Sequence, residues 1–378
     1  MAKPNQPMAR RILIAPDKFK GSLSAPEAAD AIAVGIRKID PTAELDLCPI
    51  ADGGEGFMET LAAALDGSWV HCSAVDALGR PVDSKYVVAE MDTGPVAIME
   101  MAETAGLWRL SPEERNPLEA TTRGTGMQMA HAISNYGVSR IIMGIGGSAT
   151  NDGGCGMASA LGVLFLDEAG VPIDPNPSNF SSIHRMDMEQ RIALPIITAA
   201  CDVDNPLLGE RGATAIFSAQ KGATDVGKVA LEAALEHLVA TSEGEGASRL
   251  PGAGAAGGLG FGLLHFAGAK LVSGFDLLAD LLKLEDRIKS ADHVVTGEGS
   301  IDHQSLSGKG PVALAKLAAS YSIPVTGFCG LTDQAARDSG IFESLHALAD
   351  TGLPLETLIA EAATLLTQMV GDSEFITS

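Results

Sequence analysis

The same local pattern appears near both ends of the chain: a short apolar run, a polar loop rich in glycine and acidic residues, and then a helical segment. Four such runs are residues 12–15, 44–50, 293–296 and 323–328. A capping box formed by Ser24 and Glu27 predicts the start of the first helix, which continues toward Ile39. Strands that alternate with helices favour a parallel sheet, so both chain ends are predicted to build one parallel α/β domain.

The middle of the chain has a different pattern. Residues 70–101 contain short β-rich runs separated by turn sequences, which is typical of antiparallel strands. Residues 140–143 and 196–200 are again apolar strands that end in polar loops. The length of 378 residues is too great for one ordinary core. We therefore expect an α/β domain of residues 1–72 and 290–378, with an inserted α/β domain of residues 73–289.

The charge balance limits the choice of partners. Acidic residues number 48 against 26 basic ones, and the net charge of −22 repels nucleic acid and anionic membranes. An anionic ligand then needs a site where scarce Lys and Arg side chains gather with backbone N–H groups. Five cysteines without Cys-x-x-Cys spacing favour a reduced, cytoplasmic protein. Residues 251–269 lack charged residues, but their seven glycines and His265 predict a buried glycine-rich turn and helix, with no membrane span.

The loop of residues 144–154 is the strongest functional signal. Its sequence, Gly-Ile-Gly-Gly-Ser-Ala-Thr-Asn-Asp-Gly-Gly, lets the backbone approach a ligand and point N–H groups at an anion. We predict that it binds the phosphates of a nucleotide and that Asp152 holds a metal ion. The predicted nucleotide-binding residues of this loop are Gly146, Gly147, Ser148, Thr150 and Asn151. The alternative is a tight strand-to-helix turn with ordinary packing glycines.

A second interpretation of this loop stays open. Gly144, Gly146 and Ala149 match a dinucleotide fingerprint, with Asp167 and Glu168 downstream as ribose partners. This match suggests a nicotinamide-dependent dehydrogenase of a small hydroxy-acid. A non-catalytic binder of anionic metabolites is a third class. The many carboxylates in the loops argue against the binder, and a dehydrogenase would need a well-placed His or Lys proton relay.

Other loops carry further candidates. The apolar residues 215–218 are predicted to form a strand that ends near the cleft and presents Lys221 to a phosphate. After the first strand, Asp17, Lys20 and Ser22 combine a carboxylate, a cation and a hydroxyl suited to a small hydroxy-acid. After the second strand, Asp52 and Gly53 belong to a glycine-rich loop, residues 51–56, that suits magnesium or a substrate hydroxyl.

The loop of residues 296–309 contains the predicted catalytic groups. It carries the carboxylates of Glu298 and Asp302 and the cation of Lys309, which together orient a nucleophilic hydroxyl and neutralise a transferring phosphoryl group. Asp202, after the strand of residues 196–200, is a further candidate base or metal ligand. Solvated turns are the alternative for both loops.

Taken together, these loops resemble the bacterial glycerate kinase family that is unrelated to actin-like and ribokinase-like kinases. The matching stretches span nearly the whole chain: residues 14–24, 51–56, 100–102, 120–126, 144–154, 200–207, 220–223, 254–260, 295–299 and 302–309. The resemblance implies ATP-dependent phosphorylation of D-glycerate, commonly at the 2-hydroxyl, with magnesium. It also implies two α/β domains that close on a cleft, one flavodoxin-like with a parallel sheet and one with a mixed sheet of less usual topology.

With this resemblance, the candidate residues take roles in a glycerate kinase. Lys20, Ser22, Asp52 and Arg123 are expected to hold D-glycerate, with Arg123 facing its carboxylate. Asp302 is the expected base, and Lys309 is the expected cation on the transferring phosphoryl group. ATP and D-glycerate are the expected partners, without nucleic acid or membrane, and a homodimer is left open. The chain departs from the family at Lys18, where Ser is usual, and at Ser300, where Arg is common.

Overall fold

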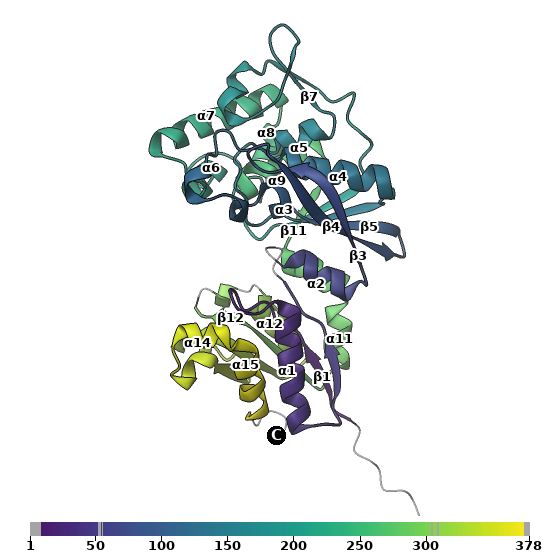
Figure 1. Ribbon diagram of the computed structural model, residues 1–378, viewed down its shortest axis with the longest axis vertical. Helices are drawn as coiled ribbons and strands as arrows, with labels where there is room; N and C mark the ends of the chain where they lie inside the picture. The colour runs from purple at the N-terminus through teal and green to yellow at the C-terminus, as the bar shows by residue number, and fades with distance from the viewer. Residues whose placement is uncertain (1–8, 52–53, 55, 304, 308–309, 374–378) are drawn as a thin grey trace, which may run out of the picture. The chain divides into compact units, whose positions relative to one another are not determined.

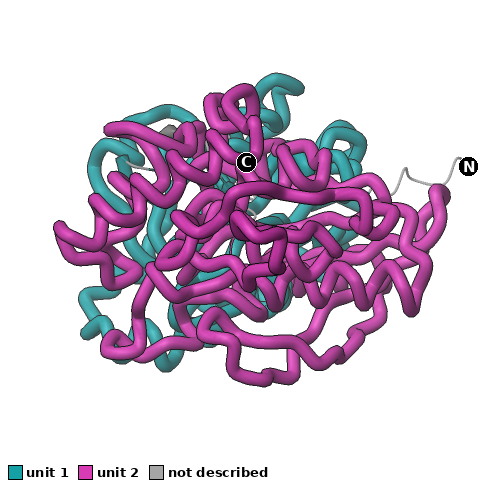
Figure 2. The backbone as a smooth tube through the Cα atoms, turned by 90° about the horizontal axis from the view of Figure 1, so that it is seen from above, with its two compact units in different colours: residues 1–52, 275–378 teal, residues 53–274 magenta. Residues whose placement is uncertain are grey.

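The computed structural model describes residues 9–51, 54, 56–303, 305–307 and 310–373. The chain divides into unit 1, residues 1–52 and 275–378, and unit 2, residues 53–274 (Figure 2). The sequence pattern placed these boundaries near residues 72 and 290. The difference on the amino-terminal side is helix α2 (Phe57–Ala64), which packs on strands of unit 2.

Unit 1 contains a five-stranded sheet in which every neighbouring pair is parallel. The strand order is β2-β1-β12-β13-β14. Their bounds are β1 (Arg11–Ile14), β2 (Glu44–Leu47), β12 (His293–Ile301), β13 (Val325–Thr332) and β14 (Ser344–Ala347). In order of appearance within this unit, the strands run 2-1-3-4-5, which is the flavodoxin-like order. The predicted parallel domain built from both chain ends is therefore confirmed.

Helices cover both faces of this sheet. They are α1 (Ala25–Ile39), α10 (Gly274–Leu281, beginning at the unit boundary), α11 (Leu284–Ser290), α12 (Gly310–Ser320), α13 (Gln334–Arg337), α14 (Leu355–Ala360) and α15 (Ala362–Gly371). The predicted capping box is present, because the Ser24 hydroxyl accepts from the Glu27 N–H while the Glu27 carboxylate accepts from the Ser24 N–H. Helices α1 and α15 lie side by side over Ile12 and Ile14 (Figure 1). Gly35 permits their close approach, because a Cβ there would lie 2.6 Å from Cβ of Val370.

Unit 2 is built on a six-stranded mixed sheet of order β11-β10-β6-β5-β4-β3. Its strands are β3 (Ser68–Val75), β4 (Pro81–Met91), β5 (Gly94–Glu100), β6 (Arg140–Gly144), β10 (Ile196–Ala200) and β11 (Lys270–Val272). Strand β4 is antiparallel to both of its neighbours, β3 and β5, and β5, β6, β10 and β11 are parallel. A small antiparallel sheet contains β7 (Leu164–Leu166), β8 (Pro172–Ile173) and β9 (Arg185–Asp187). The expected mixed sheet is confirmed.

The remaining helices of unit 2 are α3 (Ala102–Ala105), α4 (Arg123–Tyr136), α5 (Cys155–Ala160), α6 (Ala213–Phe217), α7 (Asp225–Ser242), α8 (Glu245–Ser248) and α9 (Ala255–Phe266). Side chains of α5, α6, α7 and α9 contribute to a core of aromatic and aliphatic residues that includes Phe165, Phe261 and Leu235. The strand predicted at residues 215–218 is wrong, because this segment belongs to α6. A short apolar run has no period long enough to separate a strand from a helix turn.

The uncharged segment of residues 251–269 folds as a tight turn and helix α9, as expected. Ala256, Gly257 and Gly258 all have left-handed backbone conformations at its start, with φ of 52°, 68° and 86°. A Cβ on Gly257 would come within 1.8 Å of the Thr150 carbonyl oxygen, so glycine is required for this close approach. Among the helices that the structure describes, none combines the length and apolar character needed to cross a membrane.

Candidate functional site

The parallel strands of unit 2 bring their carboxyl ends to one edge of the sheet, and the predicted phosphate loop follows the central strand β6. Gly146 and Gly147 are exposed, and within the described residues neither backbone N–H donates a hydrogen bond. The loop is held by a neighbouring segment, since Leu107 N–H donates to the Gly147 carbonyl at 2.8 Å and Ala149 N–H to the Ala105 carbonyl at 2.8 Å. An exposed pair of unsatisfied N–H groups is suited to an anion.

The other predicted donors of this loop point into the protein. Ser148 is mostly buried, and Thr150 and Asn151 are completely buried. The Asn151 amide donates to the Thr214 hydroxyl at 3.2 Å. The Thr150 hydroxyl and the side-chain oxygen Oδ1 of Asn151 have no hydrogen-bond partner among the described residues. The loop therefore offers its backbone tip to a ligand, while these side chains face the interior.

Lys221 supports the loop through a hydrogen bond to its backbone. It belongs to the 3₁₀ turn η4 (Ala219–Lys221) and is buried, and its Nζ donates to the Thr150 carbonyl oxygen at 2.7 Å. Burial lowers the pKa of Lys221 to about 7, although the charge of Asp152 opposes that fall. The lysine was predicted to contact a nucleotide, and the geometry instead places its amine on the loop backbone. This arrangement gives Lys221 a positioning role.

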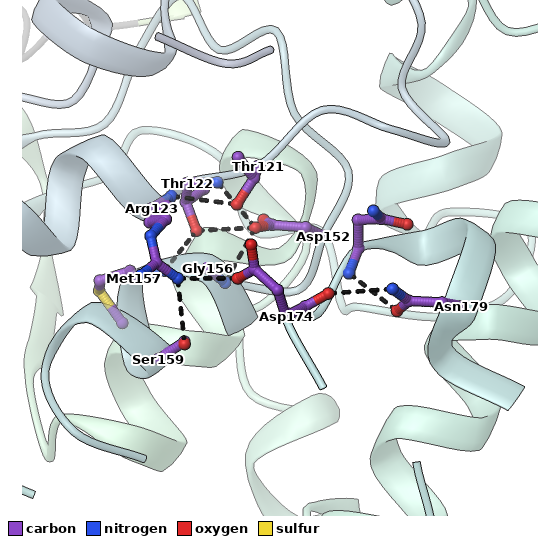
Figure 3. A network of polar contacts seen from close by, with 10 residues as sticks. Thr121, Thr122, Arg123, Asp152, Gly156, Met157, Ser159, Asp174 and Asn179 are labelled. Atoms are coloured by element: carbon purple, nitrogen blue, oxygen red, sulfur yellow. Dashed lines mark hydrogen bonds and ion pairs between the residues drawn. The ribbon is translucent and has the colours of Figure 1, made fainter. Parts of the chain in front are cut away.

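Asp152 is the centre of a buried hydrogen-bond network (Figure 3). Its carboxylate accepts from the Thr122 N–H and hydroxyl, both at 2.8 Å, and from the N–H groups of Gly154 and Gly156, both at 3.1 Å. The Thr122 hydroxyl also accepts from the Met157 N–H at 2.9 Å. The network thereby ties the phosphate loop to the amino-terminal ends of α4 and α5, where negative charge is favoured.

These contacts bear on the predicted metal role of Asp152. Burial raises the pKa of Asp152, and the four hydrogen bonds oppose that rise because they favour the charged form. Both carboxylate oxygens already accept from protein donors, and the side chain is fully buried. No group of three or more His, Cys, Asp or Glu side chains in the described part of the chain is arranged to hold a metal ion. The local geometry fits a structural anchor and does not fit a magnesium ligand.

Arg123 is the first residue of α4 and lies beside this network. Its guanidinium donates to the Asp174 carboxylate at 2.7 Å and to the Ser159 hydroxyl at 3.5 Å (Figure 3). The pair is solvent-exposed, so Arg123 can exchange Asp174 for a ligand carboxylate at small cost. The structure places Arg123 in unit 2, whereas Lys20 and Ser22, which are also predicted to hold glycerate, belong to unit 1.

Two further predicted groups of unit 2 have protein partners. Asp202 follows β10 and accepts from the Gly274 N–H at 2.9 Å. Asp167, the ribose partner required by the dehydrogenase interpretation, accepts from the Val171 N–H at 2.8 Å within the turn between β7 and β8. The contact of Asp167 closes an ordinary turn, which weakens the dinucleotide interpretation.

In unit 1, the candidate residues lie where the strand order reverses, between β1 and β12. Ligands of open α/β sheets bind at this switch point, outside the carboxyl ends of the strands. The loop after β1 lies against the carboxyl-terminal part of β12, because Asp17 N–H donates to the Gly297 carbonyl at 2.7 Å and Gly299 N–H to the Lys18 carbonyl at 3.3 Å. A Cβ on Gly299 would lie 3.0 Å from the Lys20 backbone nitrogen, so this loop and β12 run in close contact.

This switch point brings together five of the predicted residues of unit 1: Asp17, Lys20, Ser22, Glu298 and Asp302. Asp17 is buried and accepts from the Lys18 N–H at 2.6 Å. Lys20 is exposed, and the Ser22 hydroxyl donates to the Phe19 carbonyl at 3.0 Å. Phe19 is buried and anchors the loop in the core. The arrangement combines a carboxylate, a cation and a hydroxyl at one sheet edge.

Asp302 is half-buried at the end of β12. Its carboxylate accepts from the Ser305 N–H at 3.2 Å and from the Ser300 hydroxyl at 3.3 Å. Ser300, which stands where the family commonly has Arg, therefore orients this carboxylate. The neighbouring His303 is exposed and paired with Asp333 at 2.8 Å. Hydrogen bonds from the Ala336 N–H and from His303 hold the pKa of Asp333 down at about 2.

Three predicted site residues, Asp52, Gly53 and Lys309, lie outside the described residues. The structure adds others that the sequence did not single out. Thr122 and Gly156 hold Asp152, and a Cβ on Gly156 would come within 2.0 Å of the Thr121 hydroxyl oxygen. The sequence signal for Thr122 was the stretch of residues 120–126, which is one of those that resemble the family. The sequence analysis gave no role to the threonines of that stretch.

Comparisons with known proteins agree with this geometry. The family model described as the glycerate kinase family matches residues 12–373. The chain is 40% identical to a glycerate kinase of Halalkalibacterium halodurans, over 97% of this chain and 98% of that protein. It is 42% identical to the glycerate 2-kinase of Escherichia coli K12, over 85% and 86% of the two chains.

A solved structure, assigned as glycerate kinase 2 of Salmonella typhimurium LT2, superposes with a TM-score of 0.85 at 37% identity. The superposition covers 96% of this chain and 97% of that one. The match therefore extends over nearly the whole chain. The chain belongs to the glycerate kinase family.

Proposed function

We propose that the protein transfers the γ-phosphoryl group of ATP to a hydroxyl of D-glycerate, giving 2-phosphoglycerate and ADP. Membership of the family and the similarity to a protein named glycerate 2-kinase support this choice. Such a reaction serves the catabolism of organic acids in the cytoplasm, where ATP is present.

The observation that carries the proposal is the tip of the loop after β6. The N–H groups of the exposed Gly146 and Gly147 donate no hydrogen bond within the described residues, and they are suited to the oxygens of a nucleotide phosphate. The buried contacts of Asp152 and Lys221 hold that tip in place. A preorganised loop adds affinity because little ordering remains to be done when the ligand binds.

The loops at the switch point of unit 1 are proposed to hold D-glycerate. Lys20 meets its carboxylate, and Asp302 accepts the proton of the attacking hydroxyl. The hydroxyl oxygen then bonds to the γ-phosphorus, and the bond from that phosphorus to the bridging oxygen of ADP breaks. Catalysis of this kind depends mainly on positioning and on neutralising charge.

Magnesium is proposed only as part of the substrate MgATP. Mg²⁺ is usually bound through one or two carboxylates together with substrate phosphates. The described residues do not form a separate magnesium site, and the Asp152 carboxylate is already occupied by protein donors. No step of the reaction is assigned to a protein-bound metal.

Phosphorus NMR of the product made from MgATP and D-glycerate tests the proposal directly. We expect a new phosphomonoester resonance of 2-phosphoglycerate together with ADP. A resonance of 3-phosphoglycerate would correct the position of transfer. Folded protein that reduces NAD with glycerate and consumes no ATP would establish the dehydrogenase alternative.

A further inference from the structure

The cations of unit 2 near the phosphate loop are largely committed to protein partners. Lys221 donates to the Thr150 carbonyl oxygen and is buried. Arg123 is paired with Asp174, and Arg109 with Glu103. A nucleotide carries several negative charges, and the chain as a whole carries 22 more. The backbone N–H groups of Gly146 and Gly147 alone leave that charge poorly compensated.

Arg115 differs from these cations. It forms no ion pair with any carboxylate in the described part of the chain, whereas its Nε, like that of Arg109, is buried without a hydrogen-bond partner there. Among the described residues, its guanidinium makes one long hydrogen bond, from Nη1 to the Gln220 carbonyl oxygen at 3.4 Å. A guanidinium has five N–H donors, and a buried donor without a partner costs about 1–3 kcal/mol. Within the described residues, most of the hydrogen-bonding capacity of this partly buried arginine is therefore unused.

The position of Arg115 connects it to the phosphate loop. Gly222 has φ of 96°, and a Cβ there would lie 2.5 Å from the Arg115 carbonyl oxygen, so the turn of residues 220–222 packs directly on the Arg115 backbone. The same turn carries Lys221, which holds Thr150. Arg115 also follows, eight residues later in the sequence, Leu107, whose N–H donates to the Gly147 carbonyl. The turn of residues 220–222 is the packing contact that links Arg115 to the loop.

We propose that Arg115 binds a phosphate group of the nucleotide through its guanidinium. The inference rests on the proposed function of the loop and names a residue that the sequence motifs did not single out. An arginine suits this role because its planar fork of donors binds phosphate oxygens in pairs. The contact to Gln220 orients the side chain, and the anion satisfies the unused donors.

The test measures binding without turnover. Affinities of wild type and Arg115→Gln are determined by calorimetry for ATP, for inorganic tripolyphosphate and for D-glycerate, each alone. We expect ATP and tripolyphosphate to bind about 10- to 100-fold more weakly to the variant, with D-glycerate unchanged. Addition of guanidinium chloride at millimolar concentration to Arg115→Ala is expected to restore part of the ATP affinity. Arg185→Gln removes the same charge from an exposed site on strand β9 and is expected to change none of these affinities.

Each other outcome overturns the inference. Unchanged ATP and tripolyphosphate affinities would remove Arg115 from the site, and a loss confined to D-glycerate would assign it to the other substrate. An equal loss for all three ligands with a lower melting temperature would show a structural role. The proposed function is tested separately by the phosphorus NMR experiment on wild type. A protein that binds tripolyphosphate through Arg115 but does not phosphorylate glycerate would retain the anion site and lose the kinase proposal.

Discussion

Replacing Asp152 by Asn is expected to destabilise unit 2, because it removes the charge at the centre of the network in Figure 3. In its best orientation, the amide oxygen takes the place of the oxygen that accepts from the Thr122 N–H, the Thr122 hydroxyl and the Gly156 N–H. The amide nitrogen then faces the Gly154 N–H, which loses its acceptor. Two donors meet there, and neither is satisfied.

The size of the effect follows from these four bonds. Hydrogen bonds to a charged group contribute about 1.5–3 kcal/mol and neutral ones about 0.5–1.5, so three weakened bonds cost roughly 3 kcal/mol. The unsatisfied Gly154 N–H adds about 1–3 kcal/mol. A neutral amide avoids the cost of burying a charge, which is the effect that raises the pKa of Asp152, and this offsets part of the loss. We expect a net loss of about 3 kcal/mol in the free energy of unfolding.

Urea unfolding followed by tryptophan fluorescence measures this loss for unit 2, because both tryptophans of the chain, Trp69 and Trp108, belong to that unit. Thr122→Ser retains the hydroxyl and serves as the control, with a much smaller expected change. A loss below about 0.5 kcal/mol for Asp152→Asn would refute the structural role. If that result came with a raised magnesium requirement for turnover, the carboxylate would be a metal ligand after all.

Three further predictions concern catalysis, packing and pH. Asp302→Asn is expected to lower kcat by about 10² or more with little change in the KM of glycerate, since a base acts in the transition state; an unchanged kcat in steady-state assays would exclude Asp302. Gly257→Ala is expected to destabilise unit 2 by about 3 kcal/mol or more because its Cβ meets the Thr150 carbonyl oxygen, whereas Gly246→Ala, which has open space, should be neutral in the same urea assay. Burial lowers the pKa of His293 to about 4, so the unfolded chain binds a proton below pH 6.5 that the folded chain does not. The free energy of unfolding of unit 1 should therefore fall by up to about 3 kcal/mol as the pH falls from 6.5 to 4. Hydrogen exchange of β12 across a urea series measures this free energy, and His293→Gln should remove the contribution of His293 to its pH dependence. Equal slopes of this free energy against pH for wild type and variant would contradict the prediction.

The sequence pattern predicted the elements whose signals are local. The first strand, the Ser24 capping box and the return of strands near residue 293 depend on apolar runs and caps that a single segment contains. The parallel sheet of unit 1 follows from them because alternating strands and helices have few other arrangements. The segment of residues 215–218 shows the limit, since a run of four residues fits a helix turn as well as a strand.

The candidate site was predicted less completely because residue type does not reveal which way a side chain points. Thr150 and Asn151 have the chemistry of phosphate ligands, yet the structure buries both and leaves the exposed contact to backbone N–H groups. Lys221 has the charge expected of a phosphate ligand, but it holds a carbonyl oxygen. The grouping of Asp17 with Asp302 at the switch point was within reach, because both follow strands of one parallel sheet. Their assigned roles remain predictions.

The insertion of unit 2 between the strands of unit 1 has a consequence for the order of folding. The Arg11 N–H bonds to the Asp292 carboxylate, a partner 281 residues away along the chain. During synthesis, β1 and β2 leave the ribosome long before β12 is made. Until then, β1 lacks its second partner and has an unpaired edge. Unit 2 is contiguous and is complete before that partner arrives. It is therefore expected to fold first, and its compact state then replaces a long flexible loop whose closure would oppose the pairing of β1 with β12.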